Sequence, residues 1–154
     1  MKKQRIYLDT SVFGGLYDEE FKEFTEPLFD RIKNSEFEII HSNITEQELK
    51  NAPDQIRKLT ELLPKKSTEF VKSDVETANL AKKYIDEGVV GATSYADCLH
   101  IALATKHNAN ILISWNFKHI VNVIRIVGYN SVNTSEGYKP IDIRSPRELL
   151  NYED

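Results

Sequence analysis

Residues 95–116, YADCLHIALATKHNANILISWN, decide the fold. Residues 95–107 are strongly apolar and long enough for a buried helix, and residues 110–115 form a short apolar run that is typical of a buried strand. A buried helix that leads directly into a fully apolar strand is the pattern of a parallel sheet with both faces covered by helices. The stretch therefore predicts an α/β domain.

Working outward from this stretch, strands and helices alternate along the chain. Short apolar or β-prone runs predict strands at residues 5–8, 37–41, 69–72, 110–115 and 141–144. A glycine-rich turn is expected after the first strand. Apolar residues at intervals of three and four, together with end signals, predict helices at residues 20–33, 45–51, 53–63, 74–86 and 95–107, a helical stretch from about residue 117, and a terminal helix with Pro146 at its first position. This alternation predicts three layers, with the sheet in the middle.

The composition indicates one small cytoplasmic domain. Of 154 residues, 40% are hydrophobic, enough for the core of a single domain over residues 1–154. The net charge of −4 is too acidic for binding nucleic acid by bulk electrostatics, so any phosphate binding must be local. The single cysteine, Cys98, excludes an internal disulfide and fits a reducing cytoplasm. No apolar stretch approaches the roughly 20 residues of a membrane span, and the N-terminus lacks the apolar core of a signal peptide.

Four oxygen-bearing side chains follow strands or begin helices of the predicted sheet. Asp9 ends the first strand and Glu48 lies in the helix after the second. Asp97 opens the apolar helix, and Asn116 follows the fourth strand. Ligands of an open parallel sheet bind beyond the carboxyl ends of its strands, where the strand order reverses. We therefore expect these four side chains to point toward one edge of the sheet.

Helix capping is the competing interpretation of these acids. Residues 45–48, TEQE, and 94–97, SYAD, both match the capping box, in which the acid satisfies free amides of the first turn. Residues 73–76 and 145–148 match it as well, without any sign of chemistry. Asp9 is harder to explain in this way, because a carboxylate directly after a buried strand must cap the next turn, pair with a base or bind a cation.

With these acids in place, the chain resembles a known family. Three segments, YLDTSVFGG (7–15), SNITEQELKNAP (42–53) and SYADCLHIALATKHNANILISWNFKHIVN (94–122), are similar in order and spacing to the PIN domain and, within it, to the VapC-like toxin ribonucleases. The resemblance runs over nearly the whole chain. It implies a three-layer α/β/α, Rossmann-like fold with a central parallel sheet. It also implies an activity, the cleavage of RNA with Mg²⁺ or Mn²⁺ held by three or four acids.

Carried over residue by residue, the resemblance gives each acid a role. It implies that Asp9 and Asp97 contact the metal directly and that Glu48 is a ligand or positions a water. Asn116 stands where many members have a further Asp, so the resemblance implies outer-shell support from it and one negative charge fewer in the site. The resemblance further implies a homodimer and, if the chain is the toxin of a toxin-antitoxin pair, a small antitoxin protein over the acidic cleft.

The chemistry of the residues agrees with a metal-dependent reaction on RNA. Crowded carboxylates repel one another unless a hard divalent cation lies between them, and oxygen ligands without cysteine favour Mg²⁺ or Mn²⁺ over Zn²⁺. Residues 98–135 contain no acid, and we expect Lys106, Lys118 and Arg125 to contact RNA phosphates. The alternative for this region is a core helix and strand, where acids are avoided. Trp115 is either a core residue or a stacking platform for a base.

Two alternative functions remain open. The first is a PIN-like module whose metal site has decayed at Asn116 and which binds RNA or a protein partner. The second is an aspartyl phosphoacceptor domain that uses Asp9, although Ser11 stands where a haloacid-dehalogenase-type site needs a second Asp. Metal-dependent cleavage of RNA would separate the nuclease from both.

Overall fold

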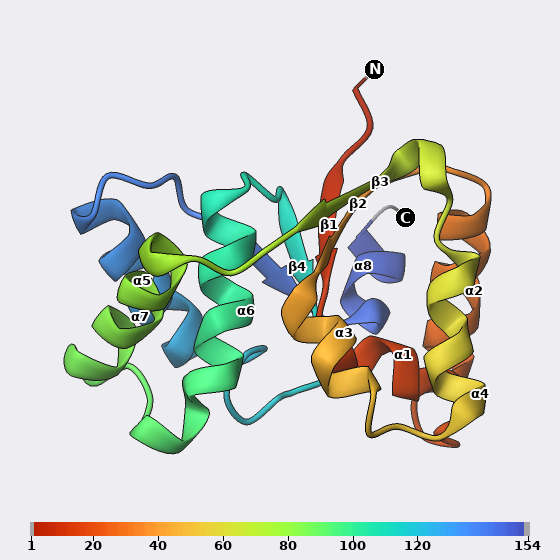
Figure 1. Cartoon of the computed structure of the whole chain (residues 1–154), viewed down its shortest axis with the longest axis horizontal. Helices are drawn as coiled ribbons and strands as arrows, with labels where there is room; N and C mark the ends of the chain where they lie inside the picture. Colours follow the sequence, from red (N-terminus) through yellow and green to blue (C-terminus); the bar gives the residue numbers. More distant parts are fainter. Residues whose placement is uncertain (1, 153–154) are drawn as a thin grey trace.

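Five parallel strands form one sheet at the centre of the molecule (Figure 1). The computed structural model describes residues 2–152, and the strand order is β3-β2-β1-β4-β5. The strands are β1 (Arg5–Leu8), β2 (Glu38–Ser42), β3 (Thr68–Val71), β4 (Ile111–Ile113) and β5 (Asp142–Arg144). Tyr7 lies opposite Ile40 on one side of β1 and opposite Leu112 on the other. The predicted α/β class with a central parallel sheet is confirmed.

Helices cover both faces of this sheet (Figure 1). The α-helices are α1 (Thr10–Gly14), α2 (Lys22–Lys33), α3 (Asn43–Leu49), α4 (Asp54–Arg57), α5 (Val75–Asp86), α6 (Tyr95–Lys106), α7 (Val123–Ser135) and α8 (Pro146–Tyr152). Short 3-10 helices are η1 (Gly15–Tyr17), η2 (Lys58–Leu62), η3 (Lys65–Ser67) and η4 (Ala92–Ser94). Helices α5, α6 and α7 lie on one side of the sheet, and α1, α2, α4 and α8 lie on the other. The predicted three-layer α/β/α arrangement is confirmed.

Alternating side chains of the strands build a hydrophobic core on each face of the sheet. On β1, Ile6 and Leu8 face one side and Tyr7 faces the other, as the two-residue period of a strand requires. Ile6 and Leu8 pack with Phe13 of α1 and Phe29 of α2, whereas Tyr7 packs with the layer of α5, α6 and α7. Burial on both faces explains why the strands are continuous apolar runs in the sequence.

The strand order reverses between β1 and β4. From β1 the chain adds β2 and then β3 on one side, after which α5 and α6 lead back so that β4 pairs with the other side of β1. The chain leaves β1 and β4 in connections at the same edge, and Asp9 N donates a hydrogen bond to Ile113 O over 3.1 Å there. This is the switch point at which open α/β sheets bind ligands.

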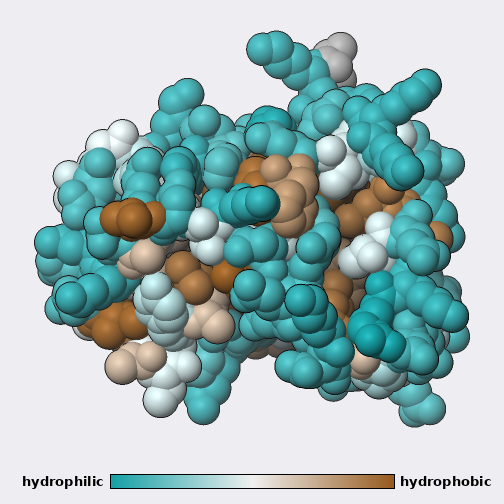
Figure 2. Space-filling view, in the orientation of Figure 1, coloured by the Kyte–Doolittle hydropathy of each residue, from teal (hydrophilic) through white to brown (hydrophobic). Residues whose placement is uncertain are grey.

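Most of the apolar side chains lie inside the molecule. The face shown in Figure 2 is largely hydrophilic, with scattered hydrophobic spots. The most exposed large hydrophobic side chains are Val123 and Ile124, at the start of α7, which are 80% and 81% exposed. Within residues 2–152, no helix combines the length and the apolar character needed to cross a membrane.

Three predictions of local structure are wrong, two of them because side-chain caps decide where a helix begins. The helical stretch expected from about residue 117 begins at Val123, where the Asn122 side chain accepts hydrogen bonds from amides of the first turn. The glycine-rich turn expected after the first strand is instead helix α1, which Asp9 caps. Residues 53–63, predicted as one helix, form α4 followed by η2.

Capping boxes are present at two helices, and one of them was predicted. Glu148 N donates to Ser145 Oγ over 3.2 Å, and Ser145 N donates to Glu148 Oε1 over 3.1 Å at the start of α8, as residues 145–148 predict. At α5 the box joins Asp74 to Thr77, one residue later than the predicted 73–76 pair. The difference arises because the helix begins at Val75, which makes Asp74 the N-cap.

The two capping boxes that competed with chemistry are absent. Helix α3 is capped by Ser42, whose Oγ accepts from Thr45 N over 3.2 Å, so Glu48 lies beyond the first turn. Helix α6 has no side-chain cap, and Asp97 lies in its first turn with no capping bond at Ser94. Capping therefore does not account for either acid.

Gly15 packs directly against the Trp115 side chain. A Cβ at residue 15 would lie 2.6 Å from Trp115 Nε1 and 2.7 Å from Thr25 Oγ1. The indole cannot move away easily, because its Nε1 donates to Thr25 Oγ1 over 3.0 Å. The ring also stacks on that of Phe21, with the two ring centroids 4.1 Å apart. The neighbouring Gly14 has open space around its Cβ position, with no atom within 4 Å.

Gly15→Ala should therefore lower the free energy of unfolding by about 1–3 kcal/mol, the usual cost of overpacking. Gly14→Ala is the matched control, and it should raise the free energy of unfolding by up to about 1 kcal/mol because alanine favours the helix. Urea unfolding followed by tryptophan fluorescence measures both values. Equal stability of the two variants would contradict the close contact between residue 15 and the indole.

Candidate active site

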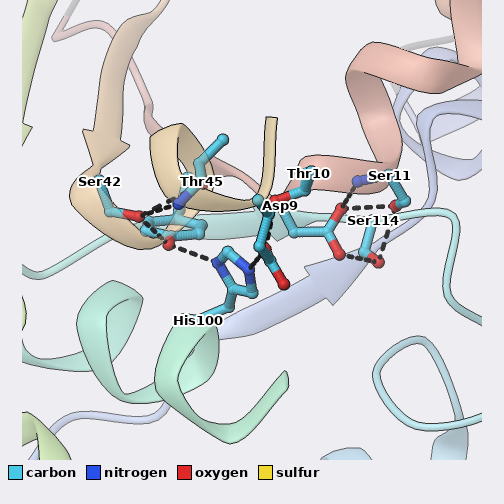
Figure 3. A network of polar contacts seen from close by, with 9 residues as sticks. Asp9, Thr10, Ser11, Ser42, Thr45, His100 and Ser114 are labelled. Carbon is cyan, nitrogen blue, oxygen red and sulfur yellow. Dashed lines mark hydrogen bonds and ion pairs between the residues drawn. The ribbon is translucent and has the colours of Figure 1, made fainter. Parts of the chain in front are cut away.

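Asp9 is a buried carboxylate at the switch point, between the ends of β1 and β4. Its side chain caps α1 and the residue is 4% exposed. Oδ1 accepts from Ser11 N over 3.1 Å and from Ser11 Oγ over 2.5 Å, and Oδ2 accepts from Ser114 Oγ over 2.9 Å (Figure 3). Burial raises the pKa of Asp9, and the charge of Asp97 raises it further, although the serine bonds and His100 oppose this. Each oxygen of the carboxylate thus accepts at least one hydrogen bond, yet burial makes the group costly to ionise.

Asp97 carries the second negative charge of this site, in the first turn of α6. Burial raises the pKa of Asp97, and the charge of Glu48 raises it further, while His100, His119 and a hydrogen bond from the Asn116 side chain lower it. The charge of another carboxylate therefore raises the pKa of each of these two acids. Negative charge is concentrated here in surroundings that are poorly solvated, which favours a cation between the acids.

Asn116 supports this site through its amide group. Its Oδ1 accepts from Lys118 N over 3.1 Å and from His119 N over 3.0 Å, so the carbonyl oxygen fixes the loop after β4. The Asn116 side chain also lowers the pKa of the Asp97 carboxyl. Ser114 Oγ accepts from Asn116 N over 2.9 Å, which connects the loop to the partner of Asp9. Asn116 thus contacts an acid of the site, while its oxygen is engaged elsewhere.

Glu48 is held by two side chains from other elements. Thr10 Oγ1 donates to Glu48 Oε1 over 2.5 Å, and His100 Nε2 lies 2.6 Å from the same oxygen. Burial raises the pKa of Glu48, but the hydrogen bond and charge of His100 together with the Thr10 bond outweigh burial and lower it overall. Glu48 is therefore ionised more readily than Asp9 or Asp97.

His100, which contacts Glu48, belongs to a buried network of polar side chains that includes Ser42 (Figure 3). His100 Nδ1 lies 2.6 Å from Tyr7 Oη, and Tyr7 Oη lies 2.7 Å from Ser42 Oγ. Tyr7, Ser42 and His100 are all at most 2% exposed. Buried polar groups of this kind persist only when they are hydrogen-bonded, and each of these side chains has its partner.

The predicted acids lie around one edge of the sheet, but they do not form a compact three-acid cluster. Among residues 2–152, no group of three His, Cys, Asp or Glu side chains is arranged to hold a metal ion. Glu48 Oε1 contacts Thr10 and His100, while the charge of Glu48 still raises the pKa of Asp97. The predicted ligand set of Asp9, Glu48 and Asp97 stays a prediction that this arrangement does not support, whereas the pair Asp9 and Asp97 remains available.

Of the three cations predicted to bind RNA, the structure brings Lys118 to this edge. Lys118 is exposed in the loop that Asn116 organises. Lys106 ends α6, nine residues after Asp97 and so roughly 13 Å along the helix at about 1.5 Å per residue. It pairs there with Asp74 and contacts Glu76 at 3.3 Å. Arg125 donates to the carbonyl oxygen of Val89. The roles of Lys106 and Arg125 stay predictions without support from their contacts.

Two other residues singled out in the sequence belong to the core. Trp115 is 6% exposed, stacked on Phe21 and bonded to Thr25, so it has no face available for a base. Cys98 is fully buried, and burial, followed by the charge of Asp97, raises the pKa of its thiol to about 12. Neither side chain takes part in the site.

The sequence analysis did not identify His100 as a residue of the site. The residue is buried, and its side chain contacts Glu48. A signal was present, because His100 follows Asp97 by three residues, and residues three apart share a face of a helix. Thr10, directly after Asp9, gave no such signal.

The phosphoacceptor alternative is disfavoured by the surroundings of Asp9. Both carboxylate oxygens accept hydrogen bonds from serine residues, and the side chain is almost completely buried. A carboxylate that attacks a phosphoryl group needs an oxygen exposed to the donor. The geometry of Asp9 fits a group held in place more than a nucleophile.

Comparisons with known proteins point to one family. The family model of the PIN domain matches residues 6–118. No curated protein matches the chain. Among solved structures, a chain of the Rickettsia felis VapBC2 complex, bound to a DNA fragment from its promoter, is similar with a TM-score of 0.55 and 14% identity, over 92% of this chain and 98% of that chain. At this identity the likeness concerns the fold.

The buried charge of Asp9 predicts a gain in stability when it is removed. Because the folded-state pKa is raised, the folded protein binds more protons than the unfolded chain, and stability falls as pH rises above the ordinary pKa of 3.8. Asp9→Asn should therefore unfold at higher urea concentration than the wild type at pH 7 in EDTA, and the difference should shrink toward pH 4. Asp86→Asn, on the exposed end of α5, is the control for net charge. Lower stability of Asp9→Asn than of Asp86→Asn at pH 7 would contradict this.

Proposed function

Because the chain belongs to the PIN domain family, whose members are generally nucleases, we propose that it is a metal-dependent endoribonuclease that hydrolyses RNA phosphodiester bonds. The observation that carries this proposal is the pair Asp9 and Asp97. Both are acids whose pKa is raised by burial, and both lie around the switch point of a parallel sheet. Such a concentration of buried charge lowers stability unless it serves a ligand of opposite charge.

The donor set fits Mg²⁺ or Mn²⁺. Mg²⁺ usually keeps several waters and takes one or two protein carboxylates together with substrate phosphates. We propose that Asp9 and Asp97 hold the ion, which would relieve the burial and repulsion that raise their pKa values. When bound, the ion supplies positive charge to the substrate phosphate and lowers the pKa of water. The choice between the two metals stays a prediction.

Other side chains of the site have separate roles in this proposal. Glu48, whose pKa is lowered, accepts a hydrogen bond from the attacking water and orients it. Asn116 lowers the pKa of Asp97 and so favours the ionised form that binds a cation. Lys118, exposed beside Asn116, binds an RNA phosphate. In the reaction, the water oxygen forms a new bond to phosphorus, the ester P–O bond breaks, and the leaving oxygen takes up a proton.

A role as the toxin of a toxin-antitoxin pair extends this proposal. It is supported by the fold likeness to the VapBC2 complex, over 98% of the matched chain. A surface cavity of about 700 Å³, lined in part by Tyr17, Leu59 and Leu62, offers apolar contacts to a small antitoxin protein. A homodimer and a cytoplasmic location stay predictions.

RNA cleavage with Mg²⁺, Mn²⁺ or EDTA tests the proposed activity. We expect cleavage with either metal and none in EDTA. Asp97→Asn should lose more than about 100-fold in rate, since removal of a group that merely supports a metal ligand already costs about 10–100-fold. Asp86→Asn should cleave like the wild type. RNA binding without cleavage in Mn²⁺ would favour the decayed module instead, and acetyl-phosphate labelling of Asp9 would favour the phosphoacceptor.

Asn116→Asp tests the distance between this residue and the metal. One oxygen of the new carboxylate can still accept hydrogen bonds from the amides of Lys118 and His119. The other oxygen takes the place of the Asn116 side-chain NH₂ group, which lowers the pKa of Asp97. We expect lower stability than wild type in EDTA, because two carboxylates then face each other, and tighter Mn²⁺ binding by calorimetry. Unchanged or weaker Mn²⁺ affinity would place Asn116 outside the reach of the metal.

A further inference from the structure

We propose that His100 is a positioning residue which, together with Thr10, fixes one oxygen of Glu48 and leaves the other to orient water. The inference rests on the proposed function, because it explains how Glu48 is held for that role. His100 Nε2 and Thr10 Oγ1 lie 2.6 Å and 2.5 Å from the same atom, Glu48 Oε1. Among the described residues, no hydrogen bond reaches Oε2. The carboxylate is therefore anchored on one side only.

The direction of the His100–Glu48 bond follows from the charge of Glu48. The hydrogen bonds of His100 and Thr10 outweigh burial and lower the pKa of Glu48, so the side chain is a carboxylate near neutral pH. A carboxylate has no proton to donate. At 2.6 Å, a lone pair on His100 Nε2 would face the lone pairs of Oε1. The imidazole must therefore carry a proton on Nε2 and donate it to Glu48.

The opposite edge of the imidazole is fixed as well. His100 Nδ1 lies 2.6 Å from Tyr7 Oη, and the two rings meet edge to face, with centroids 5.6 Å apart. Burial raises the pKa of Tyr7, so its hydroxyl group keeps its proton. Contacts at both nitrogens prevent the ring from rotating, and the Nε2–H bond points at Glu48 permanently.

The network closes on the helix that carries Glu48 (Figure 3). Tyr7 Oη lies 2.7 Å from Ser42 Oγ, and Ser42 caps α3 by accepting from Thr45 N over 3.2 Å. Glu48 lies near the other end of that helix. The hydrogen bonds therefore start at the beginning of α3, cross β1 and α6, and return to α3 at its end. A closed set of bonds fixes the helix and its carboxylate together.

The same elements carry the two acids proposed to hold the metal. Tyr7 precedes Asp9 by two residues on β1, and His100 follows Asp97 by three residues on α6. The network thus fixes Glu48 relative to both Asp9 and Asp97. A group that orients water must be held in this way, because a small displacement of an attacking group costs a large factor in rate.

Replacement of His100 and Tyr7 tests this inference. His100→Gln keeps an amide N–H close to the place of Nε2, whereas His100→Ala has no donor. We expect His100→Ala to lower the kcat of RNA cleavage about 10–100-fold with little change in KM, and His100→Gln to restore most of the loss. Tyr7→Phe should lower kcat by a smaller factor. The matched control is Tyr84→Phe, which removes another buried hydroxyl group, bonded to Asn133 away from the site.

Two further measurements do not depend on cleavage. Nitrogen-15 NMR of the imidazole should show Nε2 of His100 protonated, with a proton that exchanges slowly. Mn²⁺ should still bind to folded His100→Gln in calorimetry, because Asp9 and Asp97 are unchanged in this variant, although His100 also lowers the pKa of both acids.

Three results would overturn the inference: an unprotonated Nε2, wild-type kcat in folded His100→Ala, or no recovery in His100→Gln. If His100→Ala does not fold, His100→Gln and Tyr7→Phe decide the outcome by their kcat relative to Tyr84→Phe. If the wild type cleaves no RNA, the proposed function fails. The NMR measurement then still decides whether His100 donates to Glu48.

Discussion

A carboxylate buried at the end of the central strand is the constraint on which this structure depends. Asp9 can stay out of water only if protein groups donate to it, and Ser11 and Ser114 do so. The first of these bonds starts α1 and the second fixes the end of β4, so the same contacts that solvate the acid join the two strands of the switch point. The charge of Asp97 repels that of Asp9, which lowers the stability of the protein without a ligand and favours the binding of a cation. Functional sites often lower stability in this way.

The elements of the fold follow from the sequence where burial decides them. Strands such as Ile111–Ile113 are buried on both faces, so they appear in the sequence as continuous runs of apolar residues. Helix starts were predicted less well, because they depend on which of several neighbouring polar residues is the cap. Ser42 precedes Thr45 in the same segment, and both are good caps. The early start expected near residue 117 was wrong for the same reason, since Asn122 is the cap.

The four acids and amides predicted for the site lie around one edge of the sheet, but their contacts could not be predicted. Whether Glu48 faces the other acids or His100 depends on packing between α3 and α6, which are far apart in the sequence. The spacing between Asp97 and Lys106 predicts that Lys106 lies at the end of α6 away from Asp97. The pairing of Lys106 with Asp74 could not be predicted. The contact of His100 with Glu48 shows that a buried side chain can hold an exposed one.

The burial of Cys98 also has a practical consequence. This thiol lies one residue from Asp97 and two from His100, on the helix that supports both. A maleimide reacts with thiolate, which the native protein barely offers because the thiol is fully buried and its pKa is raised to about 12. Alkylation therefore proceeds only through molecules in which α6 has separated from the sheet. The alkylation rate of this natural cysteine therefore reports the opening of α6.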